Sequence, residues 1–269
     1  MILVIGCGYI GKAFLALRGE AKRQSIACTT SQNKVKELKY LASEVLVLPD
    51  EENLRKAMDQ SEIALILVAP STKEEYEKVY LGTAKWMKNY LASRRKKLHL
   101  LVASSTFVYA SSPKETVTED ELFVSCHPKA SLLKETEDVY LSTVNEFVSV
   151  AILRLGGIYG PGRELFERAL AVSGKQLPGS GNEPTNHIHR DDAVAAFWHV
   201  IDQKLTGIYN VTSDFHPIRK DLYKKLCSSL GVNEPTWNPN HCAEHGCGCK
   251  VDSQKLKKTG FTFLHSNGF

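Results

Sequence analysis

The sequence predicts an α/β fold, in which a doubly wound parallel sheet carries a smaller C-terminal lobe. Apolar, β-branched segments of strand length alternate with helical patterns up to residue 155, and the first strand-like segment ends in spaced glycines. Such alternation is typical of βαβ units with helices on both faces of a parallel sheet. A chain of 269 residues is long enough for one large α/β domain with an appended lobe.

The expected elements follow in chain order. Strands are expected at 2–5, 25–29, 44–48, 62–68, 98–104, 148–155 and 207–211, and helices near 11–19, 34–42, 51–60, 73–93, 130–146, 164–173 and 217–230. Beyond Arg154 the alternation stops, and loops rich in glycine, proline and asparagine follow at 156–163 and 174–186. We therefore expect a sheet domain from 1–155 with 189–212, and a smaller lobe from 156–188 with 213–269.

The opening segment MILVIGCGYIG predicts a strand, a glycine turn and the start of a helix. Gly6 permits a tight turn, Gly8 lets a pyrophosphate approach the backbone, and Gly11 allows the helix to pack closely on the strand. The first helical amides would face the phosphates. This pattern favours a Rossmann-like dinucleotide site over an ordinary glycine-rich turn. The residues assigned to it are Gly6, Gly8, Tyr9, Ile10 and Gly11.

Charge and cysteine content exclude several function classes. The formal net charge is +4, from 34 basic and 30 acidic residues that are spread along the chain, so nucleic acid is not indicated as a partner. No basic leader precedes the short apolar run at the start, which fits neither a secretory signal nor a membrane anchor. Seven cysteines, an odd number, indicate reduced thiols. A cytoplasmic protein without a membrane partner is expected.

The end of the second strand bears on the choice of coenzyme. NAD-preferring proteins place a carboxylate there for the ribose hydroxyls, whereas this chain has Thr29, Thr30 and Ser31. Lys34 could neutralise a 2′-phosphate, so NADP is favoured over NAD. A plain polar turn with a helix cap is an equal alternative.

Other residues at strand ends are also expected to flank the dinucleotide. Asp50 follows the third strand, and Ala69 and Pro70 follow the fourth. Asp50 could instead cap the helix that begins at Glu51. Asp191 and Asp192 stand at the start of an apolar helix, where we expect them to cap its amides.

Three further segments carry a family resemblance: ASSTFVYA at 103–110, RLGGIYGPGR at 154–163 and NHIHRDD at 186–192. With the glycine turn, the chain resembles the extended short-chain dehydrogenase/reductase superfamily, in its NAD-dependent epimerase/dehydratase family, and is similar to the atypical YeeZ-like subgroup. The resemblance implies an NAD(P)-binding oxidoreductase that acts on a nucleotide-sugar or a similar small polar substrate. It also allows a homodimer.

The same resemblance implies a catalytic role for Ser105, because this residue occupies the position that binds the reacting substrate oxygen. The neighbouring Ser104 is expected to contact the coenzyme. The family's YxxxK proton relay, whose lysine also holds the nicotinamide ribose, is missing, since none of the ten tyrosines is followed four places later by lysine. Alignment on Glu137 puts Lys129 at the tyrosine position and Leu133 at the lysine position. The substitute proton donors, each of which has a surface or capping alternative, are Tyr109, His127, Lys129 and Lys134.

Two groups of residues are expected in the lobe. Gly157, Tyr159, Arg163 and His189 are expected to face the substrate, with Arg163 gripping an anion or forming an ion pair within the lobe. The second group is a dense run of zinc-type ligands with unusual spacing, for which a polar loop is the favoured interpretation over a metal site or a thiol switch. Its members are His241, Cys242, His245, Cys247 and Cys249.

The sequence leaves two main hypotheses about function, and metal-dependent chemistry at 241–249 is a third possibility. In the first, the protein transfers hydride with an unorthodox proton donor. In the second, it is a catalytically silent NADP(H)-binding sensor or regulatory protein that has kept the coenzyme turn and lost the relay.

Overall fold

The computed structural model describes residues 1–17, 19, 24–70, 72, 74–121, 125, 127–240 and 248–266. The chain divides into two compact units. Unit 1 comprises Met1–Ser104, Leu132–Arg154 and Val194–Tyr209, and unit 2 comprises Ser105–Ser131, Leu155–Ala193 and Asn210–Phe269. This division differs from the expected one chiefly at residues 105–131, which belong to unit 2 although they lie between two strands of the sheet.

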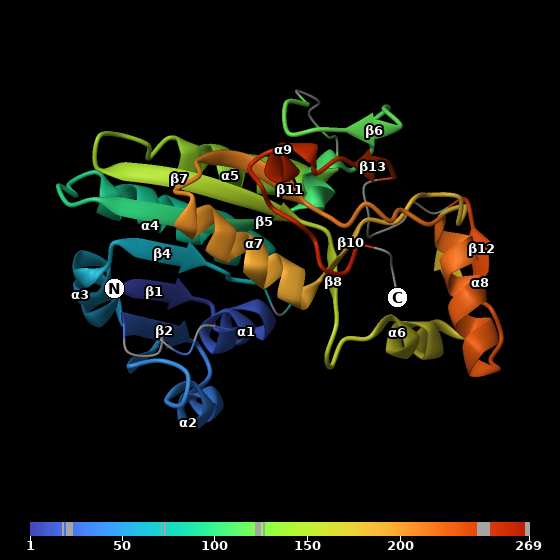
Figure 1. Cartoon of the computed structure of the whole chain (residues 1–269), viewed down its shortest axis with the longest axis horizontal. Coiled ribbons are helices and arrows are strands. Elements are labelled where there is room, and N and C mark those ends of the chain that lie inside the picture. Colours follow the sequence, from blue (N-terminus) through green and yellow to red (C-terminus); the bar gives the residue numbers. More distant parts are fainter. Residues whose placement is uncertain are drawn as a thin grey trace. The chain divides into compact units, whose positions relative to one another are not determined.

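A seven-stranded sheet forms the centre of unit 1, in the order β11-β7-β5-β4-β1-β2-β3 (Figure 1). Its strands are β1 (Ile2–Ile5), β2 (Ser25–Thr29), β3 (Glu44–Val47), β4 (Ile63–Ile66), β5 (Leu98–Ser105), β7 (Val148–Leu155) and β11 (Gly207–Val211). β1 pairs in parallel with both β2 and β4, and Ile5 lies opposite Cys28 and Ile66. The predicted doubly wound parallel sheet is confirmed. The strand order reverses between β1 and β4, which is where such sheets bind ligands.

Helices cover both faces of this sheet. They are α1 (Tyr9–Leu17), α2 (Val35–Leu38), α3 (Glu51–Gln60), α4 (Thr83–Leu91), α5 (Pro128–Leu141) and α7 (Arg190–Asp202). α1 and α7 share one face, where the Phe14 and Trp198 rings stack with centroids 4.3 Å apart. Two expected helices are shorter: a 3₁₀ turn η2 (Gln32–Lys34) precedes α2, and a π-helical turn η3 (Lys78–Gly82) precedes α4.

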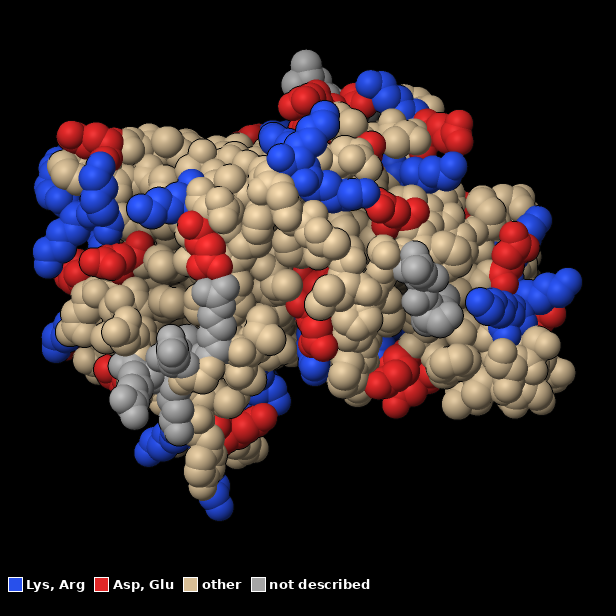
Figure 2. All heavy atoms as spheres, in the orientation of Figure 1, with Lys and Arg blue, Asp and Glu red and all other residues tan. Residues whose placement is uncertain are grey.

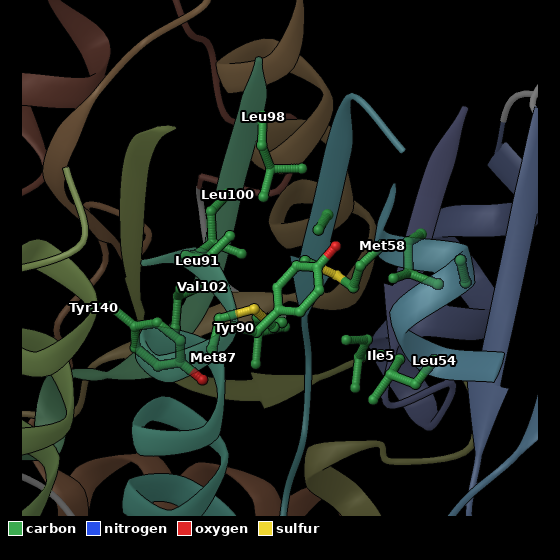
Figure 3. Packing of buried hydrophobic residues seen from close by; sticks show 14 of the residues in the cluster. Ile5, Leu54, Met58, Met87, Tyr90, Leu91, Leu98, Leu100, Val102 and Tyr140 are labelled. Carbon is green, nitrogen blue, oxygen red and sulfur yellow. The ribbon is translucent and has the colours of Figure 1, made fainter. Parts of the chain in front are cut away.

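The main core lies between the sheet and helices α3, α4 and α5. Side chains alternate between the faces of a strand, and in β5 it is Leu98, Leu100 and Val102 that enter this core. Figure 3 shows Val102 near Met87 of α4 and Tyr140 of α5, with Leu100 and Leu98 farther along the strand. The core holds the carboxyl ends of β4 and β5 in place, and these ends carry part of the candidate site.

The described part of unit 2 is built from short paired strands and short helices. The parallel pairs are β8 (Gly157–Tyr159) with β10 (His187–His189), β9 (Gln176–Pro178) with β12 (Thr236–Asn238), and β6 (Thr116–Val117) with β13 (Lys250–Val251). The helices are α6 (Leu165–Val172), α8 (Arg219–Leu230) and α9 (Gln254–Lys257), with a 3₁₀ turn η4 (Thr106–Tyr109). β8 and β9 fall in segments expected to be loops, because glycine and proline obscure strands of three residues.

The charged surface mixes both signs. On the face drawn in Figure 2, Lys and Arg side chains are interspersed with Asp and Glu side chains. In the described ranges, no helix combines the length and the apolar character needed to cross a lipid bilayer.

Candidate functional site

The glycine turn joins β1 to α1, and its backbone geometry requires two of its glycines. Gly6 has a φ of +99°, and a Cβ placed there would lie 2.6 Å from the Leu67 carbonyl carbon, so the turn packs directly on the chain that leaves β4. A Cβ on Gly11 would lie 2.8 Å from the Gly6 carbonyl oxygen. The Cys7 N–H donates to the Cys28 carbonyl oxygen at 3.0 Å and ties the turn to β2.

Gly8 differs from these two glycines, because a Cβ added to it would meet no atom within 4 Å. The fold therefore does not require glycine at this position, and the space beside the Gly8 backbone is open to a ligand. α1 begins at the next residue, Tyr9, followed by the buried Ile10. The first N–H groups of a helix have no intrahelical acceptor and form an anion site with the positive end of the helix dipole. The turn thus fits a pyrophosphate.

The polar segment after β2 lies beside this turn in the sheet. The Thr29 hydroxyl accepts a hydrogen bond from the Ser31 N–H at 3.1 Å, and Thr30 and Ser31 continue the turn. Ser31 stands at the N-cap of η2, but its side chain makes no capping hydrogen bond. Lys34 ends η2 and is exposed. The segment therefore offers hydroxyls and one cation, and no carboxylate.

The ends of β3 and β4 have different roles. Asp50 caps α3, because its Oδ1 accepts from the Asn53 N–H at 3.1 Å and its Oδ2 from the Asn53 side-chain amide at 2.7 Å. These hydrogen bonds lower the pKa of the Asp50 carboxyl. Ala69 and Pro70 follow the backbone on which Gly6 packs. The structural alternative for Asp50 is therefore the one that its contacts support.

A buried ion pair lies beneath the end of β5. The Arg154 guanidinium donates to Glu137 through Nε (3.0 Å to Oε1) and Nη2 (2.6 Å to Oε2). The side chain of Arg154 is 3% exposed and that of Glu137 is 1% exposed. The Ser104 hydroxyl donates to Glu137 Oε1 at 2.5 Å. The Ser104 hydroxyl is thus bound to this ion pair. The sequence did not predict the pair, although Arg154 lies in a segment that carries the family resemblance and the relay positions are aligned on Glu137.

Two residues that follow Ser104 and were expected to have chemical roles belong to unit 2. The Ser105 Oγ accepts a hydrogen bond from the Phe107 N–H at 3.1 Å, so Ser105 caps η4 while its own hydroxyl hydrogen stays available for donation. The Tyr109 hydroxyl donates to Asn210 Oδ1 (2.8 Å) and approaches the Thr118 carbonyl oxygen (3.0 Å). Tyr109 is 3% exposed. Its contacts are those of a structural residue.

The remaining proton-donor candidates lie on or just before α5. The His127 Nδ1 accepts from the Lys129 N–H at 3.3 Å, and its ring meets Phe107 edge-on with centroids 4.9 Å apart. Lys134 forms an exposed ion pair with Asp138, one turn along the same helix. Leu133, which the alignment on Glu137 puts at the position of the relay lysine, is 2% exposed and lines a cavity with Ser104 and Glu137.

Unit 2 has its own groove, of about 310 Å³, lined by Tyr159, Pro161, Glu164, Phe166 and His189 among others. β8 and β10 place Gly157 opposite His187 and Tyr159 opposite His189. The Tyr159 and His189 rings meet edge-on, with centroids 5.2 Å apart. Burial and the neighbouring His265 lower the pKa of His189. The groove is therefore lined by aromatic and apolar side chains together with the carboxylate of Glu164. Arg163 is exposed after β8.

The C-terminal segment adds a contact that the sequence did not reveal. Asp192, which is fully buried, accepts from the N–H groups of Leu264 and His265 at 2.9 Å each. The His265 ring stacks on His189 with centroids 3.7 Å apart. Asp192 thus anchors a distant segment, where capping of its own helix was expected. The sequence gives no signal for this contact, because His265 lies about 70 positions from Asp192 and His189.

The expected cluster of soft ligands cannot be placed, because His241, Cys242, His245 and Cys247 lie outside the described residues. Cys249, its last member, is fully buried. Among the residues that the structure does describe, no three His, Cys, Asp or Glu side chains are grouped to hold a metal ion.

Comparisons with known proteins agree with this fold. Residues 2–212 match the NAD dependent epimerase/dehydratase family. The chain is also similar to Protein YeeZ of Escherichia coli (strain K12), with 25% identity over 276 residues that cover 98% of this chain and 96% of that protein.

Three solved structures share the fold. A functionally unknown conserved protein from Silicibacter pomeroyi DSS has 20% identity and a TM-score of 0.77, covering 99% of this chain and 94% of that one. UDP-glucose 4-epimerase from Thermotoga maritima, with UDP-glucose, has 20% identity and a TM-score of 0.79, covering 98% and 93%. UDP-glucuronic acid 4-epimerase from Bacillus cereus, with UDP-glucuronic acid and NAD, has 17% identity and a TM-score of 0.79, covering 98% and 94%.

Proposed function

Because the chain belongs to the NAD dependent epimerase/dehydratase family, we propose that it is an NAD(P)-binding oxidoreductase acting on a nucleotide-sugar or a similar small polar substrate. The observation that carries the proposal is the glycine turn at the switch point of the sheet. Gly6 and Gly11 are required by close backbone contacts, whereas Gly8 faces open space. A glycine that packing does not require indicates that a ligand needs the room.

The residues that would hold a nicotinamide coenzyme all lie in unit 1. The N–H groups of Tyr9 and Ile10, at the start of α1, would bind the pyrophosphate, and Gly8, whose own N–H donates to the Gly6 carbonyl oxygen, would leave room for it. The hydroxyls after β2 would bind the adenosine ribose, and Lys34 would pair with a 2′-phosphate, which favours NADP. When bound, the coenzyme supplies a hydride donor or acceptor. The NAD in the Bacillus cereus structure makes NAD the alternative.

Ser105 is the substrate-binding group in this proposal. It ends β5, and its hydroxyl hydrogen is available to a substrate oxygen because Oγ acts as an acceptor in capping η4. The substrate class is supported by the UDP-sugars in two similar structures. The groove around His189 would bind the rest of the substrate in unit 2, and the protein would work as a homodimer or as a monomer.

A substitution at Gly8 tests the proposal. Gly8→Val should leave the melting temperature within about 2 °C of wild type, because a Cβ added at this position meets no atom within 4 Å. It should weaken binding of NADPH and NADH at least tenfold in titration calorimetry, because a branched side chain would occupy the pyrophosphate position. Gly19→Val, at another position where an added Cβ meets no atom within 4 Å, is the matched control. Coenzyme binding by Gly8→Val at wild-type affinity would exclude this site.

The missing relay favours a second function, a catalytically silent NADP(H) sensor. Its specific support is Leu133, a buried apolar side chain where the family relay has lysine. A sensor would bind NADPH, show no turnover with nucleotide-sugars, and change its subunit count or partner affinity on binding. Native mass spectrometry of the purified protein with and without NADPH separates the two, together with an assay of coenzyme oxidation in which Ser105→Ala should slow an enzyme.

A further inference from the structure

A small polar cavity lies at the carboxyl ends of β4 and β5, within unit 1. Strands and helices both contribute to its wall, which includes Val68, Tyr80, Ser104, Leu133, Glu137 and Tyr140. Its interior is about 10 Å³. That is room for about one water molecule or one hydroxyl group, and it is too small for a sugar ring.

One tyrosine hydroxyl in this wall, that of Tyr140, has no hydrogen-bond partner among the residues that the structure describes. Tyr140 is 1% exposed, and its hydroxyl oxygen is fully buried. Tyr80 is half-buried, and its ring packs edge-on against Tyr76, with centroids 4.8 Å apart. A buried hydroxyl without a partner costs about 1–3 kcal/mol. The cavity is therefore suited to a group that brings its own hydrogen-bonding atoms.

Tyr80 lies where the helix that follows β4 departs from α-helical geometry. Tyr80 lies in the π-helical turn η3, immediately before α4, and such turns are frequent at functional sites. From the other side, α5 presents Leu133 to the same cavity. A phenol from the α4 side thus shares this wall with a leucine that stands where the relay lysine is missing.

The topology indicates which part of a dinucleotide comes here. In a doubly wound sheet the dinucleotide lies across the switch point, with its pyrophosphate on the first strand-to-helix turn. The polar segment after β2 lies on one side of β1, and β4 and β5 lie on the other. If the adenosine lies over β2, the second ribose, which carries the nicotinamide, lies over β4 and β5.

We propose that Tyr80 donates a hydrogen bond to one hydroxyl group of the nicotinamide-side ribose and so holds that ribose in place of a relay lysine. Only this hydroxyl group enters the cavity, and the sugar ring stays outside it. The inference rests on the proposed function. Tyr80 is a coenzyme-binding residue in it and not a base: burial and the nearby Tyr76 raise the pKa of the phenol, which keeps its proton at neutral pH.

Two ligands that differ by one ribose test this hydrogen bond. ADP carries the pyrophosphate and adenosine, and ADP-ribose adds the second ribose, so their dissociation constants are to be measured by calorimetry on the full chain. Tyr80→Phe should weaken ADP-ribose binding about 3–10-fold, the equivalent of one hydrogen bond, and leave ADP binding unchanged. Tyr76→Phe, the matched control, removes a hydroxyl from the ring that packs on Tyr80 and should change neither constant.

Each outcome either supports or overturns the hydrogen bond. Unchanged ADP-ribose affinity in Tyr80→Phe, or an equal weakening for ADP and ADP-ribose, would overturn it while leaving the proposed function intact. Absence of binding of either ligand to the wild-type protein would overturn the proposed function, and the inference with it. Because Tyr80→Phe removes a single oxygen atom, a thermal melt within about 2 °C of wild type is expected to show that the fold is preserved.

Discussion

The glycine turn and the α5 segment are two parts of the same sheet domain that differ in what they are made of. The turn is built from backbone atoms, with Gly6 packed on Leu67 and Gly8 facing open space. The α5 segment is built from side chains, and a buried pair of Glu137 and Arg154 lies there beside the apolar Leu133. In the proposed function, coenzyme binding and proton transfer are therefore separable, because the loss of a side-chain site leaves a backbone site intact.

The largest effect is expected from breaking the ion pair. Glu137→Ala leaves the buried Arg154 guanidinium without its carboxylate, and should lower the free energy of unfolding by about 3–5 kcal/mol in urea denaturation. Glu135→Ala, on an exposed residue of the same helix, should change it by less than about 0.5 kcal/mol. A small decrease for Glu137→Ala would mean that water reaches the pair and solvates the guanidinium in the variant.

The next effect concerns the turn itself. Gly6→Ala places a Cβ 2.6 Å from backbone atoms at a positive φ, and should cost about 1–3 kcal/mol of stability through overpacking and backbone strain. Gly8→Ala should be close to neutral in the same thermal melts. Equal melting temperatures for the two variants would contradict the distinction between a packed and an open glycine.

Coenzyme preference gives a third test, confined to binding. Lys34→Ala should weaken NADP binding about tenfold, or about 1.4 kcal/mol, and leave NAD binding unchanged, because only NADP carries the 2′-phosphate. Lys36→Ala, an exposed neighbour in α2, serves as the control in the same fluorescence titrations. An equal weakening for both coenzymes would mean that Lys34 contacts the pyrophosphate or stabilises the fold, and does not bind the 2′-phosphate.

The smallest effect is expected at Lys134. Its ion pair with Asp138 is exposed on α5, so Lys134→Ala should change the free energy of unfolding by less than about 0.5 kcal/mol and leave NADPH affinity unchanged. A decrease in NADPH affinity of more than about threefold would indicate that the Lys134 ammonium group takes part in coenzyme binding.

The sequence predicted the sheet because buried parallel strands are continuous apolar runs, and it predicted the turn because close backbone contacts admit only glycine. Residues 2–5, 25–29, 148–155 and 207–211 are strands as expected. Side-chain partners were harder to foresee. The link between Ser104, Glu137 and Arg154, and that between Asp192 and His265, join residues far apart in the chain, and spacing carries no information on such pairs.

The clamp on the C-terminal segment has a practical consequence. The Asp192 carboxylate is fully buried, and it accepts hydrogen bonds from the amides of Leu264 and His265. Truncated variants that end before Leu264 would leave the Asp192 carboxylate buried without the two N–H groups that stabilise its charge. Removal of Leu264 and the residues that follow it would thus disturb the start of α7, about 70 positions upstream.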